Sequence, residues 1–114
     1  MNEELMNELI AELCTDLDIP NNTEDAEYKK LISKLNSAIK AIKRVIDFPE
    51  SYTEQMEKDY LDDYYDNVKD LTTYDYLQNG ATGELTHNEN GINRTWKSRR
   101  ECFFGIVSFA KSLQ

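Results

Sequence analysis

The sequence has 114 residues, of which 39% are hydrophobic and 31% charged, and its formal net charge is -9. This length fits one domain over 1–114 with a single core and excludes two independent cores. The acidic balance disfavours a protein that binds free nucleic acid, because phosphate binding requires clustered lysines and arginines. No run approaches the roughly 20 apolar residues of a membrane helix, and the acidic first residues are unlike a secretory signal, so we expect a cytosolic protein.

Charge alternates in sign along the chain. Residues 1–27 carry nine acids and no base, 28–49 six bases against one acid, 50–75 nine acids against two bases, and 76–114 five bases against three acids. Neighbouring helices of one bundle and helices of adjacent subunits are both able to pair across this alternation. The sequence leaves these two possibilities open.

The first predicted element is an amphipathic helix over 3–17. Asn2 is a suitable N-cap, and Pro20 cannot continue the helix. Thr23, followed by acids, is the expected N-cap of the next helix. Apolar residues share one face of the first helix at Leu5, Met6, Leu9, Ile10 and Leu13.

A long helix over 24–47 is predicted to be the central one. Its apolar positions recur at intervals of three and four residues, with a second row beside them that widens the stripe. A stripe of this width is typical of a helix that packs against two or more neighbours. The seam is Tyr28, Leu31, Leu35, Ala38, Ile42 and Val45, flanked by Ile32, Ile39 and Ile46.

The third predicted helix spans 53–77, with Thr53 as its N-cap. Six of the seven tyrosines lie between positions 52 and 76. Their rings are suited to packing on the core with hydroxyls at the wet margin, and equally to a subunit interface, and both interpretations are able to hold together. The apolar stripe is Met56, Tyr60, Leu61, Tyr64, Tyr65, Val68 and Leu71.

The helical period is lost between Gly80 and Trp96. Two short alternating segments flank Asn90-Gly91, which is the sequence that a type I′ turn prefers, so we predict a β-hairpin over 84–96. A hairpin of two strands is only marginally stable in water by itself, and it must therefore pack against the helices or against another molecule.

A last helix is predicted over 98–113 and is apolar on several sides. Such a helix is either sandwiched in the core or presents a second face to a partner. Cys14 and Cys102 lie in helical patterns without C-x-x-C spacing, and we interpret both as buried reduced thiols. The expected fold is thus mainly α: a small bundle of about four helices with a protruding hairpin between the third and the last.

Glu84, His87 and Glu89 invite a metal-site or acid–base hypothesis, which we disfavour. Their spacing matches no pair of ligands on a helix, and no second histidine or well-placed cysteine completes a site. The sequence also has no phosphate-binding or dinucleotide-binding glycine motif and no nucleophile elbow. We expect no catalytic residue, no metal and no cofactor.

Four segments follow one another along the chain: "ELMNELIAEL", "TEDAEYKKLISKLNSAIKAIKRVI", "NGATGELTHNENGINRTW" and "FFGIVSFAKSL". In this order they resemble the head–tail connector (adaptor) proteins of long-tailed bacteriophages and their prophages, also described as possible DNA-packaging proteins. The most specific part comprises Gly80, Ala81, Gly83, Glu84, His87, Glu89, Asn90, Gly91, Ile92 and Arg94.

The resemblance implies a small helical bundle that assembles as a ring beneath the portal of the filled capsid. The ring would follow the dodecameric portal, contact the next head-completion (stopper) protein, and let double-stranded DNA pass through its bore without specific binding. The protein would then occur in the host cytoplasm during assembly and at the head–tail junction of the virion.

On this basis three sets of residues are candidates for contacts. The acids Asp62, Asp63 and Asp66 are expected to face the bore and repel DNA. The last helix is expected to dock on the portal through Phe103, Phe104, Ile106, Val107 and Phe109. The hairpin is expected to contact other subunits or the stopper through Glu84, His87, Glu89, Asn90, Gly91, Ile92, Arg94 and Trp96.

Two other functions stay open. The acidic helices also suit a small regulatory binding module that mimics nucleic acid and blocks a DNA-binding partner. An enzyme ranks third, and its signature would be a loss of turnover on mutation of His87 without a loss of assembly.

Overall fold

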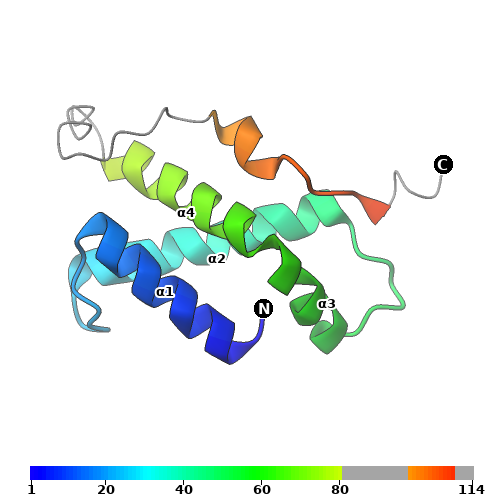
Figure 1. Ribbon diagram of the computed structural model, residues 1–114, viewed down its shortest axis with the longest axis horizontal. Helices are drawn as coiled ribbons and strands as arrows, with labels where there is room; N and C mark the ends of the chain where they lie inside the picture. Colours follow the sequence, from blue (N-terminus) through cyan, green and yellow to red (C-terminus); the bar gives the residue numbers. More distant parts are fainter. Residues whose placement is uncertain (81–97, 110–114) are drawn as a thin grey trace.

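The computed structural model describes residues 1–80 and 98–109, and these are mainly helical, as predicted. No strand occurs within these two ranges. The predicted hairpin over 84–96 lies outside the described residues. The elements in chain order (Figure 1) are α1 (Glu3–Leu17), α2 (Ala26–Ile46), α3 (Glu54–Leu61), the 3₁₀ turn η1 (Asp62–Tyr64), α4 (Tyr65–Gly80) and the 3₁₀ helix η3 (Arg99–Phe103).

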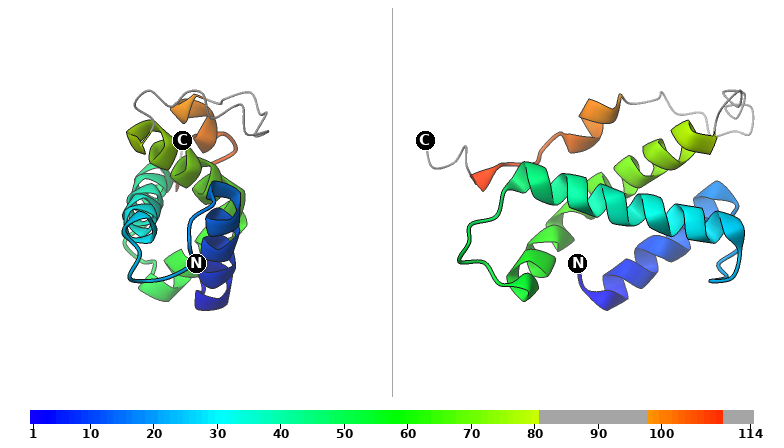
Figure 2. Two further views of the ribbon diagram at one scale, coloured as in Figure 1. Left: turned by 90° about the vertical axis from the view of Figure 1, so that its left-hand side faces the viewer. Right: turned by 180° about the vertical axis from the view of Figure 1, so that it is seen from behind.

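Helix α4 lies between the other two long helices. α1 and α2 flank it on opposite sides and run in opposite directions, and η3 covers its outer side (Figure 2). The space between the three helices is filled by apolar side chains that are almost wholly buried. These are Leu9 and Leu13 of α1, Leu31, Leu35, Ile42 and Ile46 of α2, Leu61 of α3, and Val68 and Leu71 of α4.

Both ends of α1 follow local rules. The Asn2 side chain accepts a hydrogen bond from the Leu5 amide at 2.7 Å, which confirms the predicted cap. Asp18 ends the helix in the left-handed conformation at φ 57°.

The predicted cap of the next helix was wrong, because the side chain of Asp25, and not that of Thr23, accepts hydrogen bonds from the amides at the start of α2. A carboxylate is the stronger acceptor at the positive end of a helix.

The prediction that the second helix is the central one was wrong, because α4 packs against α1, α2 and η3 and takes that place. The buried seam of α2 also differs from the predicted one at its last position. Val45 is 38% exposed, whereas Ile46 is wholly buried. A seam with strictly alternating intervals of three and four averages 3.5 residues per turn, and a straight helix has 3.6. The last step therefore needs four residues, from Ile42 to Ile46, to stay in line with the core.

The third predicted helix is broken in two. Thr53 caps α3, as predicted, by accepting from the Met56 amide at 3.2 Å. The helix then tightens to three residues per turn over Asp62–Tyr64, and α4 continues in a different direction (Figure 1). The predicted stripe loses its first member through this change of register, because Met56 is 43% exposed.

The last predicted helix, over 98–113, is wrong for its described part. Ser98 and Glu101 form a reciprocal cap that starts η3, which ends after Phe103. Phe104 is extended and Gly105 has a φ of +89°, so an α-helix cannot run through them. Both cysteines, Cys14 and Cys102, are buried and are not joined in a disulfide, as predicted.

Candidate interaction surface

The segment 104–109 presents two large apolar side chains to solvent. Phe104 is 63% exposed and Val107 is 55% exposed. The other three residues predicted to dock on a partner, Phe103, Ile106 and Phe109, are half-buried and pack against the core. The structure therefore divides the predicted docking set into an exposed pair and three residues that hold this pair in place.

Asn67 of α4 fixes the start of this segment. Its Nδ2 donates to the carbonyl oxygens of Cys102 and Phe104, at 2.9 Å in both cases. These carbonyls lie at the end of η3, where the helix itself supplies no donor. The Ile106 amide also donates to the Phe103 carbonyl oxygen at 3.2 Å. The backbone around the exposed Phe104 is thus held on both sides.

Helix η3 is anchored on α4 by an ion pair. The Arg99 guanidinium donates from Nε and from an Nη to the two carboxylate oxygens of Asp75, at 2.9 and 3.1 Å. The hydrogen bond with Asp75 raises the pKa of Arg99 further above its ordinary value. The same guanidinium lies 5.8 Å from the centre of the Phe103 ring. The two parallel hydrogen bonds between Arg99 and Asp75 fix the orientation of η3 on α4 as well as its position.

The far end of the segment is held by an aromatic cluster, defined as Phe48, Tyr52, Tyr60, Tyr64 and Phe109. The Phe109 ring centre lies 5.2 Å from that of Tyr60, 5.3 Å from that of Tyr52 and 5.9 Å from that of Phe48. Edge-on and tilted rings at these distances attract each other beyond their burial. The cluster joins the turn after α2 to the segment 104–109.

Two other tyrosines have structural roles. The Tyr65 hydroxyl donates to Glu12 of α1, and the Tyr76 hydroxyl donates to Glu27 of α2. Burial and the nearby carboxylates raise the pKa of both phenols. These two residues fit the interpretation of rings on the core with hydroxyls at the margin, whereas the aromatic cluster lies beside the exposed pair.

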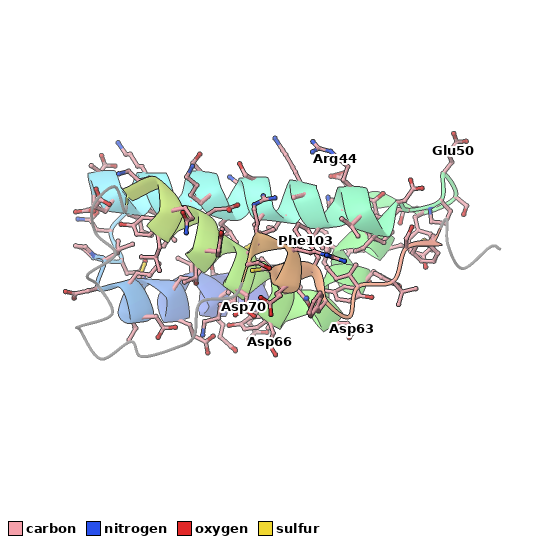
Figure 3. All side chains as sticks on the ribbon, turned by 90° about the horizontal axis from the view of Figure 1, so that it is seen from above. Arg44, Glu50, Asp63, Asp66, Asp70 and Phe103 are labelled. Atoms are coloured by element: carbon pink, nitrogen blue, oxygen red, sulfur yellow. The ribbon has the colours of Figure 1, made fainter. Side chains whose placement is uncertain are left out.

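The predicted bore acids do not share one environment. Asp62 is half-buried and accepts hydrogen bonds from the backbone amide of Asn2 at 3.1 Å and from its Nδ2 at 3.3 Å. Asp63 and Asp66 are exposed (Figure 3). Asp62 thus ties η1 to the start of α1, and only the other two are on the free surface. The predicted hairpin contacts, from Glu84 to Trp96, lie outside the described residues.

Sequence reasoning missed the parts that position the exposed pair. Asn67 was not singled out, because nothing in the sequence marks which carbonyls a mid-helix asparagine will meet. Gly105 was a visible signal: a glycine inside "FFGIV" is a typical end of a helix. Phe48 was not singled out either, and Tyr52 was considered only as one of the six tyrosines between positions 52 and 76.

The described residues offer no group of three or more histidine, cysteine or acidic side chains able to hold a metal ion. Within the same residues, no helix is long and apolar enough to cross a membrane. No family model, no curated protein and no solved structure matches the chain.

Proposed function

We propose that this chain is a structural subunit of a phage or prophage head–tail connector. It would form a ring between the portal and the head-completion or tail proteins, with DNA passing through the bore. The segment from Gly80 to Arg94 resembles that family most specifically.

One structural observation supports a docking role most directly. Phe104 and Val107 are exposed, while hydrogen bonds from Asn67 and the packing of Phe109 hold the backbone around them. An apolar side chain that is already fixed loses little conformational entropy on binding, which is why such residues often carry most of the energy of an interface. We assign this exposed pair to the contact with the portal.

The direct test is electron microscopy of the purified chain mixed with portal rings. A collar of new density on the portal supports the proposal. The double variant Phe104→Ser, Val107→Ser should lose the collar and keep its thermal unfolding midpoint, because both side chains are exposed. The matched control is Met56→Ser, which removes another exposed apolar side chain outside the segment.

The possible results distinguish the connector function from the assignment of Phe104 and Val107 to the portal contact. A collar that survives the double variant would overturn the docking assignment and leave the connector function standing. No collar with the unaltered chain, together with a gene that does not lie between capsid and tail genes, would favour the acidic regulatory module instead. Point substitutions are preferable to removing residues 104–114, because that truncation also removes Phe109 from the aromatic cluster.

A further inference from the structure

The outer face of α2 carries cations that have no ion-pair partner among residues 1–80 and 98–109. The residues opposite the buried seam are exposed and recur at helical spacing: Ser33, Ser37, Lys40 and Arg44. Neither Lys40 nor Arg44 forms an ion pair with another described residue. By contrast Lys43, on the flank of the helix, pairs with Glu57 of α3 at 3.7 Å.

The outer face of α1 is its acidic counterpart. The exposed residues opposite the core there are Glu4, Glu8, Ala11 and Thr15. Within 1–80 and 98–109, Glu4 and Glu8 have no ion-pair partner. Two acids on the flank of α1 share one cation inside the subunit, because Lys69 of α4 lies 3.3 Å from Glu12 and 3.2 Å from Asp16. Some of the opposite charges along the chain therefore pair within one subunit, whereas the charges on these two outer faces pair with none of the described residues.

The two faces match in spacing as well as in sign. Along α1 the exposed positions 4, 8, 11 and 15 are separated by four, three and four residues. Along α2, taken from Arg44 backwards, positions 44, 40, 37 and 33 have the same separations. Intervals of three and four are those at which two helices pack along each other. An antiparallel pairing places Glu4 opposite Arg44 and Glu8 opposite Lys40, and it leaves the small residues Ala11, Thr15, Ser33 and Ser37 where the helices approach most closely.

The placement of the two faces decides what kind of assembly they permit. α1 and α2 lie on opposite sides of α4 and run in opposite directions (Figure 2). Arg44 projects from the outer edge of α2, away from α4 (Figure 3). A second copy set beside the first in nearly the same orientation therefore brings its α2 antiparallel to the first copy's α1.

We infer that the outer face of α2, Ser33, Ser37, Lys40 and Arg44, binds the outer face of α1, Glu4, Glu8, Ala11 and Thr15, on a second copy of this chain. The contact is heterologous: each copy uses one face for the copy before it and the other for the copy after it. A small constant rotation between copies closes such a series into a ring. This inference rests on the proposed function for the closure of the ring, and it specifies which surfaces make the contact.

Two other occupants of these faces are disfavoured. A two-fold dimer would set each face against itself, which places Lys40 and Arg44 opposite the same cations. A nucleic acid would meet the basic face of α2 on a chain whose net charge is -9. That charge opposes a polyanion at the range over which phosphate binding is steered.

The test uses cysteine variants of the full chain and a short bis-maleimide crosslinker, without a portal. Ala11→Cys and Ser37→Cys are placed on two separate chains, one of which carries a size tag. Both positions are exposed, so these substitutions should leave the fold intact, which circular dichroism checks. Ser51→Cys, at an exposed position between α2 and α3, measures random collision. The native cysteines are buried and are present in every sample.

Mixing the Ala11→Cys and Ser37→Cys chains should give about tenfold more crosslinked dimer than either chain alone or either chain with Ser51→Cys. The yield should fall at about 1 M salt, where charges are screened beyond about 3 Å. Glu8→Lys on the first chain, or Lys40→Glu on the second, should lower the yield, and the two together should restore it.

Three results would overturn the inference: a mixed yield no higher than that of the Ser51→Cys control, a predominance of dimers from one variant alone, or suppression of the crosslink by short duplex DNA that binds through Lys40 and Arg44. Failure of the portal collar with a positive crosslink would count against the proposed function only. A collar without the crosslink would count against this contact only.

Discussion

The side-chain amide of Asn67 holds the carbonyl oxygen of Phe104 at 2.9 Å, and the same nitrogen also reaches the carbonyl oxygen of Cys102. One side chain in α4 therefore fixes the backbone of Phe104, which is the most exposed large apolar residue among those that the structure describes. The link connects the helical bundle to the proposed docking segment, and its loss should affect stability and binding together.

Asn67→Asp should destabilise the protein, because it replaces a donor by a carboxylate that repels both carbonyls. We expect a loss of about 1–3 kcal/mol in the free energy of unfolding, the usual cost of leaving such groups unpaired. Amide hydrogen exchange should rise over 102–107. Asn36→Asp is the matched control, because Asn36 is exposed on α2. Equal effects of the two substitutions would contradict the role assigned to Asn67.

The end of the buried seam in α2 gives a second prediction. Ile46→Ala should lower the free energy of unfolding by about 2–4 kcal/mol, since it leaves a cavity in the core. Val45→Ala, one residue earlier, should change it by less than about 0.5 kcal/mol, because that side chain is 38% exposed. Urea denaturation of both variants measures the difference. A larger effect at Val45 would mean that the strict 3.5-residue pattern describes the helix better.

The sequence pattern was sufficient for the long elements and insufficient for their breaks. α1 follows from its Asn2 cap and its apolar spacing, and α2 follows from its apolar spacing, which are local signals that the core reinforces. The break at Asp62–Tyr64 does not, because helix-compatible residues such as Asp62 are held there by Asn2, sixty positions away in the chain. A contact of that range leaves no local trace.

The exposed pair was predicted only as part of a larger apolar set. Composition shows that 103–109 is too apolar for one helical face, but it cannot separate the residues that anchor from those that project. That division depends on the left-handed Gly105 and on the position of Phe109 among three other rings. Phe48, which packs against Phe109, precedes α3 in the chain, whereas Phe109 follows η3.

Gly105 provides a third prediction, because its φ of +89° is a conformation that side chains disfavour. A Cβ there would meet no atom within 4 Å, so the cost of Gly105→Ala is in the backbone and not in a clash. We expect a loss of about 1–2 kcal/mol for alanine and less for Gly105→Asn, since asparagine tolerates left-handed geometry better.

Chemical denaturation ranks the three residues at position 105, and circular dichroism reports on the helix content. The expected order of stability is glycine, then asparagine, then alanine. A stable alanine variant with more helix than the unaltered chain would instead support a continuous helix through this position, as the apolar pattern alone predicted.

The last prediction concerns acid, and it follows from the network between α1 and α4. Glu12 accepts a hydrogen bond from the Tyr65 hydroxyl and another from Lys69 at 3.3 Å. These bonds, that from Tyr65 foremost, lower the pKa of Glu12 below its ordinary value of 4.5. A carboxyl whose pKa is lower in the folded state stabilises the fold above pH 4.5, and this contribution disappears as the pH falls through the folded-state pKa. The free energy of unfolding should therefore decrease on acidification below about pH 5.

Glu12→Gln should flatten that acid dependence, and Tyr65→Phe should flatten it in part, because Lys69 still contacts the carboxylate. At neutral pH, Tyr65→Phe should lower the melting temperature by about 4 °C, the shift expected when one hydrogen bond is lost from a domain of this size. Glu3→Gln removes the same charge at an exposed position in the first turn of α1 and is the matched control. Thermal unfolding of all four proteins between about pH 3 and pH 7 measures the slopes, which bracket the ordinary carboxyl pKa. If Glu12→Gln and Glu3→Gln give the same slope, α1 is held against α4 by apolar packing alone, and the network around Lys69 does not stabilise that contact.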